Sequence, residues 1–376
     1  MGINFVTGVP DSLLSPIIRH FCNDLTNTQH VIAANEGAAI GLAIGNFVGT
    51  GNVPLVYLQN SGLGNAINPI VSLAVPEIMA TPIILLIGWR GEIFDNGEQR
   101  KDEPQHFLQG QITIPLLETM QIPNVTVDGA SAFLLALEKM KKEALSRRGP
   151  TALLIRKEAF ANLEIKNAIS SSVAIRNSQC TLSRESALRT LISHIGSSSP
   201  IVSTTGMLSR ELYESREKSE HGSDLLIVGG MGHAISISAG LAIAKPDKKI
   251  FCLDGDGAVL MHMGALVTSA LQDNIIHVIF NNGSHDSVGG HPLASEKANY
   301  CEVAIACGYD KAIKCEDKAG ILAAVDTARK SKGSTLIEIF CKKGNRPNLS
   351  RPKESPSQNK ENFMNYLGTR NEIVEK

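Results

Sequence analysis

Short apolar runs alternate with helical segments along almost the whole chain, and this alternation constrains the fold more than any other feature. Most runs are apolar throughout, which is typical of strands that are buried on both faces. Strands of this kind separated by helices predict an α/β fold with mainly parallel sheets covered by helices on both faces. The expected strands are residues 29–33, 53–58, 82–87, 151–155, 200–204, 224–228, 249–253, 275–280 and 335–340.

A polar, serine-rich segment over residues 162–180 divides this alternating pattern into two halves. The chain has 376 residues, which is enough for two domains of ordinary size, each with its own core. Residues beyond 344 are rich in Pro, Ser, Asn, Lys and Glu, a composition typical of mobile segments. We expect a first domain over 1–165, a linker over 166–180, a second domain over 181–345 and a polar C-terminal tail over 346–376.

Charge and cysteine usage bear on partners and location. The net charge of −1 gives no overall field that would favour nucleic acid or an anionic membrane. The seven cysteines are scattered without a C-x-x-C pair, which indicates reduced thiols. No secretory signal is visible, and no apolar run approaches the roughly 20 residues that span a bilayer. We therefore expect a cytoplasmic protein that binds neither nucleic acid nor a membrane.

The segment 249–282 carries the strongest motif. Gly255-Asp256-Gly257 follows one apolar strand, and Asn282 follows the next. Glycines let a phosphate approach the backbone closely, and a helix that begins near Ala258 would direct its first N–H groups at that anion. Asp256 and Asn282 offer the oxygen ligands that Mg²⁺ prefers, and neighbouring parallel strands bring them to one sheet edge. A lone Gly-Asp-Gly is usually a turn, but the paired motifs predict a site for a diphosphate and Mg²⁺.

Gly-Asp-Gly followed by paired asparagines resembles the cofactor signature of thiamine-diphosphate enzymes. The resemblance implies that Asp256 and Asn282 bind Mg²⁺ together with the main-chain carbonyl of Ser284. It further implies cofactor contacts from Gly255, Gly257 and Ala258. It also implies contacts from two other loops. In one, Met231 would hold the cofactor bent and the Gly229 carbonyl would accept a hydrogen bond from the cofactor's amino group. In the other, Thr205 would lie on the diphosphate side of the cofactor. Taken alone, Met231 is as readily explained as a core methionine in a glycine-rich turn.

A cofactor of this kind needs a carboxylic acid against its pyrimidine ring. Glu36 directly follows an apolar run and heads an Ala/Gly-rich helix, and Asn35-Glu36-Gly37-Ala38 is similar to the family's pyrimidine-domain motif. Burial would raise the pKa of Glu36 and let it hold a proton near neutral pH. A first-turn glutamate favoured by the helix dipole is the alternative. In this family the cofactor lies between domains of two subunits, which implies a homo-oligomer of at least two chains.

Four stretches are more specific than the cofactor signature: residues 8–12, residues 59–65, residues 88–92 with 101–106, and residues 281–290. They resemble the family of phosphonopyruvate decarboxylases and the related sulfopyruvate decarboxylases, from about residue 5 to about residue 341. The resemblance implies decarboxylation of 3-phosphonopyruvate, a small anionic 2-oxo acid, to phosphonoacetaldehyde and CO₂ in phosphonate biosynthesis. Sulfopyruvate or another 3-substituted pyruvate is the alternative substrate. A non-catalytic subunit that keeps the fold is the second alternative.

Polar side chains in these stretches are candidates for substrate binding and proton transfer. A phosphonate needs cations or hydrogen-bond donors, and decarboxylation needs a proton donor. Each residue alone is more often a solvated loop residue, but the group is concentrated at presumed strand ends. The substrate candidates are Ser12, Asn60, Arg90 and Lys101, and the catalytic candidates besides Glu36 are Asp11, Asp102, His106, His285 and Asp286. The chain departs from the family in residues 204–210, which lack the lysine that often follows Thr-Gly there.

Overall fold

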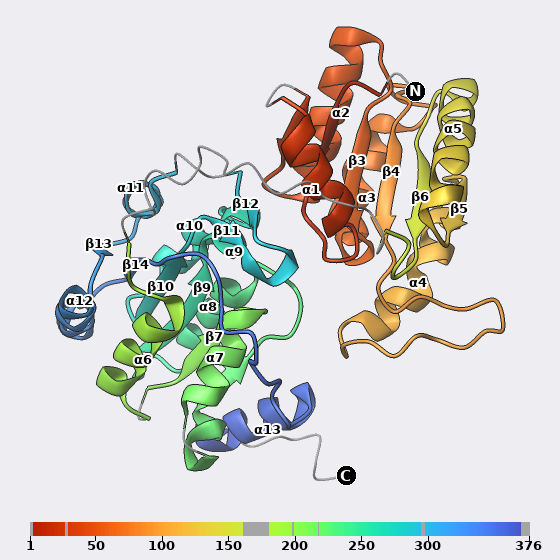
Figure 1. The fold of residues 1–376 in the computed structure, drawn as a ribbon. Helices are drawn as coiled ribbons and strands as arrows, with labels where there is room; N and C mark the ends of the chain where they lie inside the picture. Colours follow the sequence, from red (N-terminus) through yellow and green to blue (C-terminus); the bar gives the residue numbers. More distant parts are fainter. Residues whose placement is uncertain are drawn as a thin grey trace. The chain divides into compact units, whose positions relative to one another are not determined.

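The computed structural model describes residues 3–26, 29–160, 180–197, 199–216, 218–294 and 298–369. The chain divides into two compact units, residues 1–171 with 291–294 and residues 172–290 with 295–376. Each unit contains a six-stranded sheet (Figure 1). The predicted linker lies outside the described residues except for Cys180, so its boundaries stay a prediction.

The sheet of the first unit is entirely parallel, with the order β2-β1-β3-β4-β6-β5. Its strands are β1 (Val6–Gly8), β2 (His30–Ile32), β3 (Leu55–Gln59), β4 (Ile84–Gly88), β5 (Asn124–Val127) and β6 (Thr151–Ile155). Side chains along a strand point alternately to the two faces, and both faces are apolar here. One face packs against α1 (Ser15–Asp24) and α5 (Ala130–Arg147), and the other against α2 (Glu36–Thr50), α3 (Leu63–Pro69) and α4 (His106–Thr119).

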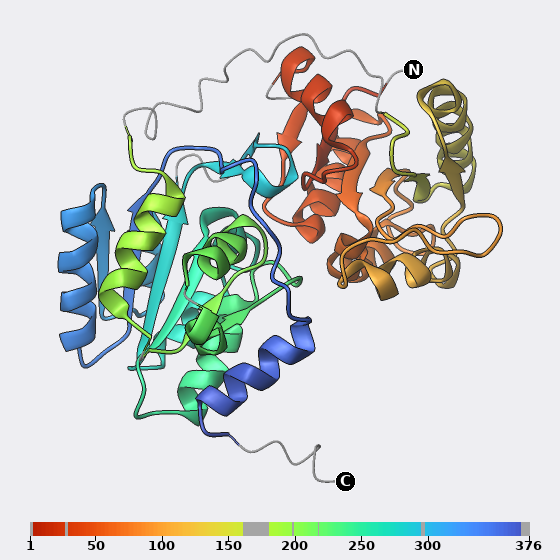
Figure 2. The same ribbon diagram turned by 60° about the horizontal axis from the view of Figure 1, so that its bottom comes forward.

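The sheet of the second unit is also parallel, with the order β13-β14-β10-β9-β7-β8. Its strands are β7 (Ile201–Ser203), β8 (Asp224–Leu226), β9 (Ile250–Gly255), β10 (Ile275–Asn281), β13 (Lys311–Cys315) and β14 (Thr335–Phe340). One face packs against α6 (Arg184–Ile195), α7 (Met207–Ser215) and α12 (Lys318–Lys330), with α12 beside α6 (Figure 2). The other packs against α8 (Ala234–Ala244), α10 (Ala265–Ala270) and α11 (Tyr300–Ala306), while α9 (Asp256–Met261) starts where β9 ends.

The two sheets share one topology. When the six main strands of each unit are numbered in chain order, both sheets read 2-1-3-4-6-5. In such sheets ligands bind at the carboxyl edge where the chain switches direction, here between the first and third strands. The first and third strands of each sheet end at this edge. Asp11 and Asn60 come just after these strands in the first unit, and Thr204 and Asp256 do so in the second. The predicted fold of two parallel sheets covered by helices on both faces is confirmed.

The C-terminal tail differs from the expectation, because it contains a helix, α13 (Pro356–Tyr366). Asn359 pairs with the open edge of β8: its side-chain oxygen accepts a hydrogen bond from the Leu226 N–H (2.9 Å), and its amide donates to the Asp224 carbonyl (3.0 Å). Phe363 is buried against the same unit. These contacts cover an exposed strand edge, which explains why a polar segment is folded here.

No helix of the described residues is long and apolar enough to cross a membrane.

Candidate functional site

The Gly-Asp-Gly motif forms the turn from β9 into α9, and it buries Asp256 to 3% exposure. One carboxylate oxygen accepts a hydrogen bond from the Gly257 N–H (2.9 Å), and the other accepts one from the Gly283 N–H (2.7 Å). Burial raises the pKa of Asp256 to about 7, and the nearby charge of Asp286 adds to the rise. A bound cation would stabilise the charged form of this carboxylate.

The loop after β10 lies directly beside that turn. Phe280 is the register partner of Gly255, so the residues that follow β10 reach the start of α9. The Asn282 amide nitrogen donates to Asp286 (2.6 Å), while its side-chain oxygen accepts from the Ser284 N–H (3.1 Å). The three predicted metal ligands, Asp256, Asn282 and Ser284, therefore lie at one sheet edge and are buried.

Glycines shape two neighbouring loops. Gly206, with φ +101°, precedes α7 and follows the half-buried Thr205. Gly232, with φ +88°, has no room for a side chain, because a Cβ there would lie 2.8 Å from the Ala258 carbonyl oxygen. The loop that contains Gly229 and the half-buried Met231 is thus packed against the helix of the Gly-Asp-Gly motif.

Glu36 is the first residue of α2 and is only 7% exposed. The preceding Asn35 caps the helix by accepting from the Ala38 N–H (2.8 Å). The Asn65 amide donates to one Glu36 oxygen (2.9 Å), and Gly62 lies so close to the other that a Cβ there would be 2.5 Å from it. Burial raises the pKa of Glu36, although the Asn65 hydrogen bond partly opposes the rise.

Arg90 lies at the centre of the polar group at the carboxyl edge of the first sheet. Its guanidinium pairs with Asp102 through two nitrogens, Nε at 2.7 Å and Nη2, and Nη1 donates to the Ser12 hydroxyl (3.0 Å). Asn60 fixes the Arg90 main chain, donating to its carbonyl (2.9 Å) and accepting from its N–H (3.2 Å). Burial alone would raise the pKa of Asp102, but the hydrogen bonds and charge of Arg90 hold it below its usual range. The positive charge of Arg90 is therefore largely offset.

The remaining candidates differ in protonation. Asp11 is fully buried, and burial raises its pKa to about 6 against the opposing charge of Arg90. Burial lowers the pKa of His106 and of His285 to about 4, so both rings are neutral at neutral pH. Lys101 is exposed and forms no ion pair with another described residue. Asp11 is thus the candidate best able to exchange a proton near neutral pH.

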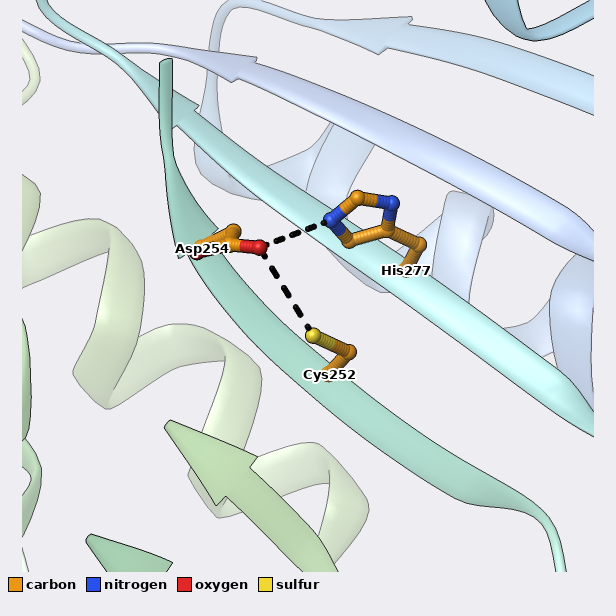
Figure 3. A group of neighbouring side chains, drawn as sticks. All are labelled: Cys252, Asp254 and His277. Atoms are coloured by element: carbon orange, nitrogen blue, oxygen red, sulfur yellow. Dashed lines mark hydrogen bonds and ion pairs between the residues drawn. The ribbon is translucent and has the colours of Figure 1, made fainter. Parts of the chain in front are cut away.

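A second group with metal-binding side chains lies within the sheet below the Gly-Asp-Gly turn. Figure 3 shows the Asp254 carboxylate linked to both the His277 ring and the Cys252 thiol. The same oxygen of Asp254 lies 3.3 Å from His277 Nε2 and 3.9 Å from Cys252 Sγ. The Tyr309 hydroxyl lies 3.4 Å from the other His277 nitrogen. Burial raises the pKa of Cys252 well above its ordinary value, which keeps the thiol protonated. The group is best described as a hydrogen-bonded link between β9 and β10.

Comparisons with known proteins match both units. Residues 1–115 match the thiamine pyrophosphate enzyme N-terminal TPP binding domain, and residues 203–339 match the C-terminal one. Phosphonopyruvate decarboxylase of Streptomyces viridochromogenes is 32% identical, covering 98% of this chain and 92% of the relative. That of Streptomyces hygroscopicus is 33% identical, covering 97% and 91%. Sulfopyruvate decarboxylase of Methanosarcina acetivorans is 26% identical, covering 89% and 88%.

The chain belongs to the phosphonopyruvate decarboxylase family of thiamine pyrophosphate enzymes. Membership confirms the predicted resemblance, the enzyme class and thiamine diphosphate as cofactor. The candidate residues of this family member also fit the cofactor physically. Asp256 is a buried carboxylate whose charged form a cation would stabilise, space is open beside the Gly255 Cα, and Glu36 is a buried acid with a raised pKa.

Sequence reasoning missed several residues that contact the candidates in this family member. Asn65 and Gly62 lie in the quoted stretch 59–65, but nothing in the sequence pairs them with Glu36. Arg184 donates to Asp286 across 102 positions of sequence (3.0 Å), and no local pattern signals such a contact. Only the folded chain brings these partners together.

Replacing Gly62 with alanine is expected to displace the Glu36 carboxyl, because the new Cβ would lie 2.5 Å from it. If Glu36 is the acid that the sequence predicts, we expect kcat to fall by about 100-fold, because misplacing a catalytic group by about 1 Å can cost that much. Gly64→Ala is the matched control, since a Cβ at Gly64 meets no atom within 4 Å. Steady-state assays of both variants test this, and equal kcat values would contradict it.

Proposed function

We propose that this chain decarboxylates 3-phosphonopyruvate to phosphonoacetaldehyde and CO₂, with thiamine diphosphate and Mg²⁺. The proposal rests chiefly on the 32% identity to a phosphonopyruvate decarboxylase over 98% of the chain. The chemistry of the candidate residues supports it, because each unit presents a buried group that suits one end of the cofactor.

In this proposal, Asp256, Asn282 and the Ser284 carbonyl would hold Mg²⁺, which would neutralise the charge of the cofactor's diphosphate. Carboxylate, amide and carbonyl oxygens are the ligands that Mg²⁺ favours, and phosphate oxygens and water complete its shell. The Gly255–Ala258 turn and Thr205 would border the diphosphate, and the Gly229–Met231 loop would support the rest of the cofactor. Glu36, in its protonated form, would donate a hydrogen bond to the pyrimidine ring. When bound, thiamine diphosphate supplies the nucleophilic carbon and accepts the electron pair that departing CO₂ leaves behind.

The reaction consumes one proton, which must reach the carbon that loses CO₂. We propose Asp11 as its source, because burial raises the pKa of Asp11 to about 6 and its Oδ1 has no hydrogen-bond partner among the described residues. Asp102 is a poorer donor, since Arg90 holds its pKa low. His106 and His285, with pKa values of about 4, can donate or accept hydrogen bonds as neutral rings.

The phosphonate requires donors and positive charge. We propose that Lys101 supplies the charge and that Ser12, Asn60 and Arg90 form the polar wall of the substrate site. Arg90 would contribute mainly directed hydrogen bonds and little net charge, because Asp102 offsets its charge. Sulfopyruvate carries one negative charge less on its acidic group, so the strength of local positive charge would separate the two substrates.

We further propose that the chain assembles as a homo-oligomer of at least two subunits. The cofactor would lie between the pyrimidine-binding domain of one subunit and the diphosphate-binding domain of another. The domain boundaries proposed for this arrangement are residues 1–165 and 181–345.

A substrate panel tests the proposed function. Purified protein with thiamine diphosphate and Mg²⁺ is incubated with phosphonopyruvate, sulfopyruvate and pyruvate, and the aldehydes are measured by coupled reduction. We expect the highest kcat/KM with phosphonopyruvate. A higher kcat/KM with sulfopyruvate would replace the substrate but keep the reaction, and absence of aldehyde from all three would refute decarboxylation of this class.

A further inference from the structure

We infer that Arg184, held in place by Glu211, positions the proposed metal ligand Asn282 by fixing Asp286. The inference rests on the proposed function, because it takes Asn282 as a ligand of Mg²⁺. It assigns to Asp286 the role of orienting Asn282, and it gives a role to two residues outside the cofactor motifs, Arg184 and Glu211.

The four side chains form a continuous chain of contacts within the second unit. Arg184, the first residue of α6, pairs with Glu211 of α7 through Nε (2.8 Å) and Nη2 (3.0 Å). Its third nitrogen, Nη1, donates to Asp286 Oδ2 (3.0 Å), and the same oxygen accepts from the Asn282 amide (2.6 Å). The Arg184 and Glu211 side chains are 8% and 1% exposed. Ion pairs this buried hold fixed geometry, whereas exposed pairs are screened by water.

The charge of Asp286 determines which way the Asn282 amide faces. A carboxylate oxygen can only accept hydrogen bonds, so it must face the amide nitrogen and not the amide oxygen. Asn282 Oδ1 is therefore directed to the opposite side, where it is available to a metal and accepts from the Ser284 N–H. An amide whose orientation is already fixed loses less side-chain entropy when it binds a cation.

Arg184 offsets the negative charge of Asp286, which lies near the second carboxylate of the site, Asp256. Asn282 contacts Asp286, and the N–H of the next residue, Gly283, donates to Asp256 (2.7 Å), so the two carboxylates lie near one another. Arg184 and the Gly344 N–H (3.1 Å) both donate to the Asp286 oxygen that contacts Asn282. They hold that oxygen in place in the metal-free protein. Glu211 in turn fixes the plane of the Arg184 guanidinium by pairing with two of its nitrogens.

The test compares Arg184→Lys with Arg216→Lys. Arg216 is also buried and also pairs with one carboxylate, Asp224, through two nitrogens (2.9 and 3.0 Å), but it joins the end of α7 to the start of β8. Lysine keeps the charge and loses the planar fork in both variants. Thiamine diphosphate binding to the cofactor-free full-length protein is measured by calorimetry across a Mg²⁺ titration. Stability is measured by thermal unfolding.

We expect Arg184→Lys to raise the Mg²⁺ concentration for half-maximal cofactor binding by about 10-fold, the lower end of the effect of losing a direct partner of a metal ligand, because Arg184 acts on Asn282 through Asp286. Saturating Mg²⁺ should restore binding and most of kcat. Arg216→Lys should lower stability and leave the Mg²⁺ requirement unchanged. An unchanged requirement in folded Arg184→Lys, or an equal rise in both variants, would overturn the inference.

Asp286→Asn provides a second test if Arg184→Lys does not fold. An asparagine at 286 can face Asn282 with either its oxygen or its nitrogen, so the amide of Asn282 is no longer oriented. We expect the same rise in the Mg²⁺ requirement, and wild-type behaviour would overturn the inference. Failure of the proposed function is distinguishable, because the wild-type protein itself would then form no aldehyde in the substrate panel, and failure of the proposed metal site would appear as wild-type binding of thiamine diphosphate without any dependence on Mg²⁺.

Discussion

Replacing Glu36 with glutamine is expected to lower kcat by about 10²–10⁴-fold, the range for losing one acid–base group. Glutamine keeps the size of the side chain and can still accept the hydrogen bond from Asn65, but it has no exchangeable acid proton. Because the Mg²⁺–diphosphate contacts are proposed in the other unit, cofactor binding should change little. Steady-state assays and calorimetry measure the two effects separately.

Glu138→Gln is the control for this variant, since Glu138 lies exposed on α5 in a pair with Lys142. It should retain wild-type kcat. A Glu36→Gln enzyme with wild-type kcat would show that some other acid serves the cofactor. Loss of cofactor binding equal to the loss of kcat would assign Glu36 to binding alone.

Replacing Asp256 with asparagine is expected to weaken Mg²⁺-dependent binding of thiamine diphosphate by more than about 100-fold, beyond the usual effect of losing a mere partner of a ligand. The variant should fold, because asparagine removes a buried carboxylate and its oxygen can still accept one main-chain hydrogen bond. Calorimetry with and without Mg²⁺ measures the binding, and circular dichroism measures the fold. Asp273→Asn, at an exposed position, is the control.

Wild-type binding by Asp256→Asn would refute its role as a metal ligand. The two inactive variants together also test the proposed assembly. If each site combines Glu36 of one subunit with Asp256 of another, mixed dimers of Glu36→Gln and Asp256→Asn contain one intact site in two. Random exchange at equal amounts then restores about a quarter of wild-type activity. No restoration after proven exchange would place both residues of each site in one subunit.

The sequence was sufficient to predict most of the buried strands, because short runs that are apolar at every position are typical of strands covered on both faces. The expected strands 151–155 and 335–340 coincide with β6 and β14. The strands β1, β5 and β13 were not expected. β5 and β13 lie at the edge of a sheet, whereas β1 lies between β2 and β3 and has only three residues. Lys311 and Lys314 of β13 are exposed, so β13 lacks the continuous apolar pattern on which the prediction depended. The helix α13 was missed for a similar reason, since its stability comes from Asn359 and Phe363 and not from its own periodicity.

The candidate site was predictable where its residues are neighbours along the sequence or follow adjacent strands. Asp256 and Asn282 could be paired because strand ends meet at one edge of a parallel sheet. The pairing of Arg90 with Asp102 was not predictable, because it depends on how the loop between β4 and α4 folds back on itself. The Arg184–Glu211–Asp286 contacts join three separate elements, and only tertiary packing specifies them.

The hydrophobic clusters described for each sheet draw their residues from one unit alone. Heat should therefore melt the chain in two separate events, each with its own enthalpy, and a single melting temperature would describe neither. Saturation with the coenzyme would raise the melting temperature of each unit only as far as that unit contributes to binding it.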